Sequence, residues 1–327
     1  MTIRFLINFF LIALPIGTSL GILFGLQANR AATGQAPLFA PKPTDGPGSD
    51  GKPKPKQGLG HEALCMKSYG FTPDTKGQQY ILNPNQWNWN AGDPGGLCMN
   101  VTYFNNGTYP TKFVAPEFYV TWQYPQGPEN NPVHAFPNVE AKADVLPTPV
   151  GDITKMDLEL EWSYATGNGT MEAASKADLT TAKLNTNVAI DMFIDADKKL
   201  AQLPGNATYE VMIWLAAYGD STQPLGYNDG VKATKTVNGT AFSLYQKQNQ
   251  QKQWVLTWYP EDPTLKFYGD VSSLISTIFT LNLNGLPSKS DYLGYVSLGS
   301  EAFYSPEVVT FNVPHFSIDI ETSASSS

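Results

Sequence analysis

The sequence predicts an all-β domain built as a sandwich or a closed sheet, and two observations carry this expectation. From about residue 64 to residue 321, short runs of alternating, β-branched and aromatic residues are separated by clusters of Gly, Pro, Asn and Asp. Many short strands within about 260 residues are typical of sandwiches and barrels, whereas βαβ folds alternate strands with helices. The 7 Trp, 16 Tyr and 17 Phe in 327 residues supply enough apolar surface for a sizeable core.

Seven segments carry the strand pattern most clearly. They are Phe118–Tyr124, Leu158–Tyr164, Thr186–Phe193, Tyr209–Ala216, Gln253–Trp258, Tyr292–Leu298 and Val308–Asn312. One segment departs from the pattern, because Asp270 can cap a helix over Val271–Leu281. Leu274, Ile275 and Ile278 would form the apolar face of that helix.

The N-terminal region has a different composition. Arg4 precedes an apolar run, Phe5–Leu26, that carries no charge. A signal peptide has a core of roughly 7–15 apolar residues, whereas about 20 apolar residues can span a bilayer. The run is therefore interpreted as a signal peptide or a single-span signal anchor. Both interpretations place the rest of the chain outside the cytosol. The predicted organisation is a signal or anchor (1–30), a Pro/Gly/Lys-rich linker (31–60), a folded domain (61–322) and a disordered tail (323–327).

Charge and cysteine content restrict the ligand and the compartment. Only 15% of residues are charged and the net charge is −8, which argues against nucleic acid and favours an uncharged ligand such as carbohydrate. Two cysteines and three scattered histidines leave little material for a metal site, and no metal is expected. Cys65 and Cys98 can form one disulfide in an oxidising compartment. Five sequons agree with an extracellular location: Asn100, Asn106, Asn168, Asn206 and Asn238.

Three carboxylates lie inside or beside strand-like runs, where alternation indicates which neighbours share a face. In YEVMIWL (209–215), Glu210 shares its face with Met212 and Trp214, opposite an apolar face of Val211, Ile213 and Leu215. A carboxylate beside Trp and Met fits the floor of a cleft, where the aromatic ring offers a platform for a sugar.

The other two carboxylates are Asp191 and Glu301. Asp191 is expected on a face with Ala189 and Phe193, and Glu301 on a face with Tyr295, Ser297, Gly299 and Phe303. Three carboxylates on one concave face would suit glycoside hydrolysis, which needs one carboxyl group as acid and another as nucleophile or base. The third carboxylate could adjust the pKa values of these two. The alternative is that they are isolated inward-facing charges balanced by hydrogen bonds. A serine hydrolase is disfavoured because no G-x-S-x-G elbow is present.

Five motifs in order along the chain carry a resemblance to a known family. They are YILNPNQWNWNAGDPGGLC (80–98), AIDMF (189–193), YEVMIWLAAYGD (209–220), YGDV (268–271) and GSEAF (299–303). Together they resemble glycoside hydrolase family 12, the small endo-β-1,4-glucanases and xyloglucanases, and the similarity extends over most of residues 64–321. In that order, they resemble the family's sugar-stacking N-terminal region, its auxiliary-aspartate strand, its nucleophile strand, the start of its single helix and its acid/base strand.

The resemblance implies a β-jelly roll sandwich of two antiparallel sheets with a concave cleft and one short α-helix. It implies Glu210 as nucleophile, Glu301 as general acid/base and Asp191 as an auxiliary group, with retention of configuration and carboxyl groups about 5–5.5 Å apart. It implies Asn85, Trp87, Trp122, Met212 and Pro224 as substrate-binding residues, and a Cys65–Cys98 disulfide.

The activity implied is that of a retaining endo-β-1,4-glucanase on cellulose, mixed-linkage glucan or xyloglucan, working without a cofactor as an extracellular monomer. The sequence departs from the family after Glu301, where Ala302-Phe303-Tyr304-Ser305-Pro306 replaces the usual Pro-Phe-Thr-Gly, and in segments 125–148 and 221–237. Two alternatives stay open: an inactive carbohydrate-binding or wall-associated protein, and a transglycosylase that uses the same covalent intermediate. The preferred β-glucan and cleavage of the N-terminal segment also stay open.

Overall fold

The computed structural model describes residues 58–66, 69–219 and 223–323. The predicted signal or anchor, the linker up to residue 57 and the tail from residue 324 lie outside the described residues. Within the described part, no helix is both long enough and apolar enough to cross a membrane.

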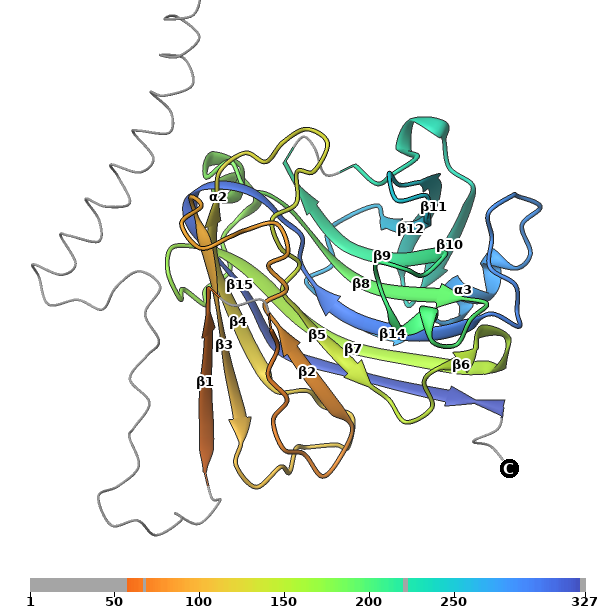
Figure 1. Ribbon diagram of the computed structural model, residues 1–327, viewed down its shortest axis with the longest axis horizontal. Coiled ribbons are helices and arrows are strands. Elements are labelled where there is room, and N and C mark those ends of the chain that lie inside the picture. Colours follow the sequence, from red (N-terminus) through yellow and green to blue (C-terminus); the bar gives the residue numbers. More distant parts are fainter. Residues whose placement is uncertain (1–57, 67–68, 220–222, 324–327) are drawn as a thin grey trace, which may run out of the picture.

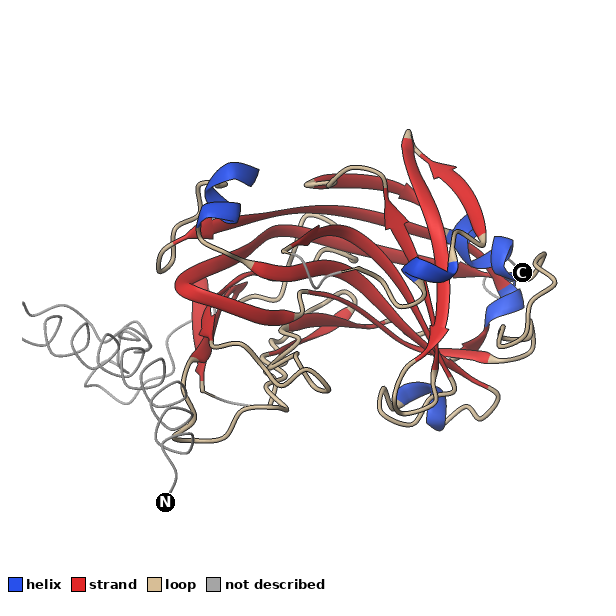
Figure 2. Ribbon diagram, turned by 90° about the horizontal axis from the view of Figure 1, so that it is seen from above, coloured by secondary structure: helices blue, strands red, loops and turns tan. Residues whose placement is uncertain are grey.

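The described residues form two sheets packed face to face (Figures 1 and 2). The outer sheet is antiparallel throughout. Its order is β1 (Leu59–Cys65), β3 (Gly96–Phe104), β4 (Glu117–Tyr124), β15 (Ala302–Thr322), β7 (Ile153–Thr166) and β13 (Lys266–Asp270).

The inner sheet carries the predicted carboxylate strands and curves over the outer one (Figure 1). Its order is β2 (Gln79–Asn83), β5 (Asn138–Lys142), β14 (Tyr292–Gly299), β8 (Asn185–Asp195), β9 (Tyr209–Tyr218), β12 (Trp254–Pro260), β11 (Thr240–Gln248) and β10 (Ala233–Val237). The short strand β6 (Thr148–Pro149) pairs with the start of β14. Only the β9–β12 pair among these named strands is parallel. The all-β sandwich expected from the sequence is therefore confirmed.

The core lies between the sheets, because alternate residues of each strand point inward. On β9 these are Val211, Ile213 and Leu215, as the alternation predicted. Large aromatic side chains fill the space between the layers, and Trp122, Trp258, Phe311 and Phe316 are among the fully buried ones.

Two α-helices occur among the described residues, where one was predicted. Helix α3 (Ser272–Ile278) matches the expected segment and buries Leu274, Ile275 and Ile278. Its N-cap residue is Val271, while the Asp270 carboxylate accepts hydrogen bonds from the backbone N–H groups of Ser272 and Met156. Helix α2 (Lys176–Thr181) was not predicted, and a capping box of Ser175 and Asp178 starts it. Single 3₁₀ turns occur at η1 (Val150–Asp152), η2 (Leu200–Gln202) and η3 (Tyr227–Asp229).

The two cysteines are paired, as the resemblance implied. Cys65 and Cys98 lie opposite each other on β1 and β3, and their disulfide joins the edge strand to the outer sheet. Of the sequon asparagines, Asn100 lies within β3 and the other four are exposed: Asn106, Asn168, Asn206 and Asn238. Asn238 and Gly239 have positive φ angles of 45° and 83° and close the β10–β11 hairpin, which confirms the predicted turn.

Candidate active site

A second, smaller apolar cluster lies on the concave face of the inner sheet, away from the main core. It consists of Ala189, Met212, Trp214 and Val255. Glu210 is two residues from Met212 on β9 and therefore shares this face. The predicted grouping of Glu210 with Met212 and Trp214 is confirmed.

Asp191 lies on the same face of the neighbouring strand β8. It is directly opposite Met212 on β9 and Ser297 on β14, while Phe193 is opposite Glu210. Directly paired residues share a face, so Asp191 and Glu210 are diagonal neighbours across the β8–β9 pair. Asp191 is 6% exposed, and its Oδ1 has no hydrogen-bond partner among the described residues. An unpaired buried carboxyl oxygen is costly, and it marks this position as a candidate functional group.

Glu301 occupies a different place from the one alternation predicted. Strand β14 ends at Gly299 and β15 begins at Ala302, so Glu301 lies in the connection between them. The face shared with Tyr295 and Ser297 therefore does not extend to Glu301. Strand β15 then pairs with β8 at Ala302 before it continues into the outer sheet beside β4 and β7, so Glu301 sits where the chain leaves the inner sheet.

An asparagine that the sequence reasoning missed holds Glu301. The side-chain amide of Asn187 donates to Oε2 of Glu301, and the backbone N–H of Glu301 donates to Oδ1 of Asn187 at 3.2 Å. This reciprocal pair fixes both the chain and the carboxyl group. The alternation of Asn187 with Ala189 and Asp191 in β8 was the signal that could have found it.

A buried hydroxyl network lies directly behind Glu301. Ser300 Oγ lies 2.6 Å from the Tyr164 hydroxyl and 2.8 Å from Thr186 Oγ1, and Thr186 Oγ1 donates to the Glu301 carbonyl at 2.6 Å. Trp122 Nε1 donates to the same Tyr164 hydroxyl at 3.1 Å. The implied role of Trp122 in binding substrate is therefore wrong, because the side chain is 0% exposed and lies in the main core between the sheets.

Three carboxyl groups interact electrostatically at this site. Burial and the nearby Glu301 raise the pKa of Glu210 from 4.5 to about 8. Burial also raises the pKa of Glu301 to about 7, although the hydrogen bond from Asn187 opposes this rise. The pKa of Asp191 lies well above its usual range because of burial and then the charges of Glu210 and Glu301. The structure therefore brings the three predicted carboxyl groups together, and burial raises the pKa of each of them.

The loop that carries Asn85 and Trp87 is tied to the residues around Glu301. Phe136 N–H donates to the Asn85 carbonyl at 3.1 Å, and Ala302 N–H donates to the Ala135 carbonyl at 2.9 Å. Asn85 has a positive φ of 44°, and Trp87 is 53% exposed. A large exposed aromatic side chain anchored next to the carboxyl site is a candidate binding platform.

The remaining predicted binding residues occupy two environments. Met212 is 5% exposed on the concave face, and its Sδ accepts a hydrogen bond from Trp214 Nε1 at 3.3 Å. Pro224 is buried, and its carbonyl accepts a hydrogen bond from Tyr227 N–H at 3.0 Å. A contact with a sugar would therefore involve the segment around Pro224 more than its ring.

Further buried polar groups continue across the concave face from Asp191. Ser297 is opposite both Asp191 and Glu140, and Ser297 Oγ lacks a hydrogen-bond partner in the described part of the chain. Glu140 is 7% exposed and forms an ion pair with Lys142. The alternating Asn138-Val139-Glu140 run held a signal for Glu140 that the sequence reasoning did not use.

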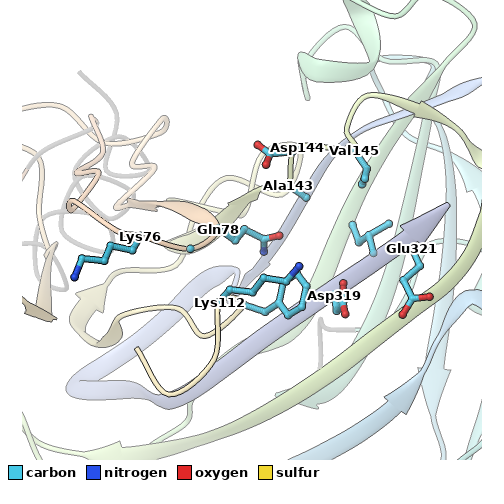
Figure 3. A pocket seen from close by; sticks show the side chains of 11 residues that line it. Lys76, Gln78, Lys112, Ala143, Asp144, Val145, Asp319 and Glu321 are labelled. Atoms are coloured by element: carbon cyan, nitrogen blue, oxygen red, sulfur yellow. The ribbon is translucent and has the colours of Figure 1, made fainter. Parts of the chain in front are cut away.

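A separate pocket of about 830 Å³ lies away from these carboxyl groups (Figure 3). Charged side chains of both signs line it, among them Lys76, Lys112, Asp144, Asp319 and Glu321. None of the site residues predicted from the sequence lines this pocket, so the concave face remains the candidate active site.

Known proteins share this fold and about a quarter of the aligned residues. The family model described as Glycosyl hydrolase family 12 matches residues 78–321. The chain is 25% identical over 241 residues to a xyloglucan-specific endo-beta-1,4-glucanase A of Emericella nidulans, covering 74% of this chain and 85% of that protein. It is 24% identical to the inactive glycoside hydrolase XLP1 of Phytophthora nicotianae, covering 70% of this chain and 82% of that protein.

Among solved structures, the endoglucanase 3 of Trichoderma harzianum superposes with a TM-score of 0.61 at 25% identity, covering 80% of this chain and 98% of that chain. The family match extends over most of the described domain, and it includes the strands that carry Glu210 and Asp191 and the β14–β15 connection that carries Glu301. The chain therefore belongs to glycosyl hydrolase family 12.

Proposed function

We propose that this protein is a retaining endo-β-1,4-glucanase that cleaves internal bonds of a β-glucan by double displacement. The observation that carries the proposal is the meeting of Glu210, Glu301 and Asp191 at the concave face, where burial raises the pKa of all three carboxyl groups. Two carboxyl groups flanking the scissile bond are the minimum that retaining hydrolysis requires. The xyloglucan specificity named for the Emericella nidulans relative supports xyloglucan as the first substrate to test.

In the proposed mechanism, Glu210 attacks the anomeric carbon as a carboxylate while protonated Glu301 donates its proton to the leaving oxygen. The glycosyl–Glu210 ester is then hydrolysed by a water molecule that Glu301, now ionised, deprotonates. Asn187 keeps Glu301 in position through both steps, because it bonds the backbone as well as the carboxyl group.

The proposed mechanism needs Glu210 ionised and Glu301 protonated, and Asp191 can favour this combination. Burial raises the pKa of Glu210 as well as that of Glu301, so the mechanism needs a group that keeps Glu210 ionised while Glu301 is protonated. A protonated Asp191 beside Glu210 can donate a hydrogen bond that stabilises the Glu210 carboxylate. We infer that this hydrogen bond favours the reactive state, with the proton on Glu301.

The experiment that tests the proposal is an assay of the described domain on xyloglucan, mixed-linkage glucan and carboxymethyl-cellulose. Glu210→Gln and Glu301→Gln should each abolish release of reducing ends, whereas Glu161→Gln on the outer-sheet strand β7 should retain the wild-type rate. Loss of activity in the Glu161 variant would show that the assay reports fold damage rather than chemistry.

Azide separates the two roles on an activated aryl glycoside. In Glu301→Ala, azide should intercept the glycosyl–enzyme and give the β-glycosyl azide, with recovery of turnover. In Glu210→Ala, azide should replace the nucleophile and give the α-glycosyl azide. The opposite pattern of products would reverse the assignment of Glu210 and Glu301.

A second candidate function is binding without hydrolysis. Its support is the similarity to the inactive glycoside hydrolase XLP1, together with the altered segment that follows Glu301. Retained affinity for a β-glucan without release of reducing ends from any of the three polymers would establish this second function instead. Formation of longer oligosaccharides would indicate transglycosylation.

We place the folded domain outside the cytosol, as a monomer that is secreted or held by the N-terminal apolar segment. Support comes from the apolar run at residues 5–26, the Cys65–Cys98 disulfide and four exposed sequon asparagines. Mass spectrometry of the protein from a eukaryotic culture would locate the mature N-terminus and the glycans, and an unmodified cytosolic chain would refute the placement.

A further inference from the structure

The pocket of about 830 Å³ lies where the β2–β5 edge of the inner sheet meets the end of β15 in the outer sheet (Figure 3). Its walls come from four stretches of chain: 76–78 before β2, 112–113 before β4, 143–145 after β5 and 319–321 at the end of β15. These stretches are separate from the strands that carry the candidate active site. We call this cavity the edge pocket.

Hydrogen bonds tie the walls of the edge pocket to one another. The backbone N–H of Gln78 donates to the Lys112 carbonyl at 2.7 Å, and Gln78 Nε2 donates to the Ile318 carbonyl at 3.2 Å. A Cβ atom at Gly77 would clash with the backbone of Lys112, so glycine permits this close approach of two walls. The edge pocket is therefore a built feature of the fold.

The lining of the edge pocket combines apolar and acidic side chains. Four residues supply apolar surface: Phe113, Ala143, Val145 and Ile320. Three residues supply carboxylates: Asp144, Asp319 and Glu321. A ligand that satisfies both kinds of surface must carry cationic groups and apolar groups close together.

The two lysines of the edge pocket make other contacts. Lys76 Nζ donates to Thr108 Oγ1 at 3.1 Å, and Lys112 Nζ lies 4.5 Å from the centroid of the Phe113 ring. Among the described residues, no ion pair joins either lysine to a carboxylate.

Negative charge therefore predominates at the end of β15. Burial and then the charge of Glu321 raise the pKa of Asp319, although Lys112 and Lys155 oppose this rise. Glu321 lies 3.7 Å from Lys155 Nζ, but Lys155 also pairs with Asp157. A further cation in the edge pocket would relieve the repulsion between these carboxylates.

The first described residue, Gly58, lies close to the edge pocket. The Gly58 carbonyl accepts a hydrogen bond from Asn105 N–H at 3.0 Å. Two residues further along, the Gly107 carbonyl accepts a hydrogen bond from Lys76 N–H at 2.8 Å, and Lys76 lines the pocket. The chain that precedes Gly58 therefore starts beside the rim of the edge pocket.

That preceding chain carries the groups that the lining requires. Residues 52–56, which lie outside the described residues, have the sequence KPKPK. A residue before proline favours an extended backbone, and proline-rich chains extend by about 3.1 Å per residue, so residues 52–58 reach up to roughly 19 Å. The alternation presents ammonium groups and apolar proline rings in turn, which matches the carboxylates and the apolar wall.

We propose that the KPKPK segment of this chain binds in the edge pocket, with its lysines facing the three carboxylates and its prolines against the apolar wall. Covalent attachment keeps the segment near the pocket at an effective concentration on the order of millimolar, so a few weak ion pairs are enough to hold it. The bound segment fixes the point at which the linker leaves the domain. Residues 31–51 then remain as the spacer to the N-terminal apolar run.

Cleavage by trypsin after Lys56 tests this proposal in the full chain, and it needs no enzymatic activity of the protein itself. Trypsin does not cut Lys–Pro bonds, so within the segment it cuts only between Lys56 and Gln57. The wild-type chain should be cut more slowly than a synthetic peptide of residues 50–60, because only the released segment fits the protease. Raising the salt concentration from about 50 to about 500 mM should reduce this protection, since salt screens exposed ion pairs.

Two sets of substitutions change the two partners separately. Asp319→Asn with Glu321→Gln should raise the cleavage rate about fivefold, because each exposed ion pair contributes a few-fold to the binding equilibrium. Lys52→Ala with Lys54→Ala leaves the folded domain untouched and should give a similar rise, measured against a peptide with the same substitutions. Glu161→Gln, on the outer sheet and outside the pocket, should keep the wild-type rate.

Carbodiimide cross-linking identifies the occupant of the pocket. In a mixture of unlabelled and nitrogen-15-labelled chains, mass spectrometry should find amide links from the segment to Asp319 or Glu321 within single copies. Links that combine the two labels at random would show that the segment of a second copy binds, and would overturn the proposal. Wild-type cleavage as fast as that of the peptide, or a rate that neither set of substitutions changes, would also overturn it.

Discussion

The buried carboxyl site should make the protein less stable as the pH rises from 5 to 8. Glu210 has its pKa raised from 4.5 to about 8, so over this interval the folded chain binds more protons than the unfolded chain. Stability contributed by the protonated carboxyl is present below the unfolded pKa and is lost as the pH rises through the folded pKa. We therefore expect the free energy of unfolding to fall between pH 5 and pH 8.

The magnitude follows from the size of the shift. One pKa unit corresponds to about 1.4 kcal/mol, so the full shift of Glu210 would amount to roughly 5 kcal/mol. Glu210 is only partly buried and shares its proton with Glu301, so we expect about half of that value. At pH 8, Glu210→Gln should then unfold about 5–10 °C above the wild-type protein, at roughly 2–4 °C per kcal/mol for a domain of this size.

The assay is thermal unfolding followed by circular dichroism in a buffer series from pH 5 to pH 8.5. The advantage of Glu210→Gln should be small at pH 5 and should grow with pH, and Glu301→Gln should show a smaller effect of the same sign because its shift is smaller. Glu161→Gln, on the outer sheet, should follow the wild-type curve throughout. Parallel curves for Glu210→Gln and the wild-type protein across the whole range would refute the reasoning.

Three further outcomes are expected from the site. Asn187→Ala should move the alkaline limb of the pH–rate profile to higher pH, because loss of the amide donor raises the pKa of Glu301. An alkaline limb at the wild-type pH would show that Asn187 does not affect the pKa of the proposed acid/base group. Trp87→Ala should raise KM for xyloglucan about fivefold with an unchanged melting temperature, since the side chain is exposed. Trp122→Ala should cost about 3–5 kcal/mol of stability and lower kcat with little change in KM, and a selective rise in KM would restore its role as a substrate contact.

Alternation along single strands predicted the part of the site that lies inside regular strands. The faces of Glu210 and Asp191 followed from period-2 geometry, and both were confirmed. The same reasoning would have corrected the role implied for Trp122. Its side chain alternates with those of Phe118 and Val120 along β4 and points with them into the core. The resemblance implied instead that Trp122 contacts substrate in the cleft, and the burial of its side chain in the core contradicts that direction.

Features made by segments distant in the sequence were not predictable in this way. Glu301 lies between two strands, where alternation is interrupted, and its partner Asn187 lies 114 positions earlier in the chain. Tyr227 meets Tyr245 only because a tight turn folds back on β11. Helix α2 has a single buried residue, Leu179, so it offered almost no apolar periodicity.

Strand β15 passes from one sheet to the other beside Glu301, so the two carboxyl groups proposed to be catalytic are held by different parts of the fold. Glu210 lies in a strand that belongs to the inner sheet alone, whereas Glu301 is fastened through Ser300 and Tyr164 to the packing between the layers. A small sliding of one sheet against the other would therefore displace Glu301, the proposed acid/base group, relative to Glu210, the proposed nucleophile. Mutations that repack the interior should thus appear first as altered proton transfer, while changes in the rim loops alter only which chains are accepted.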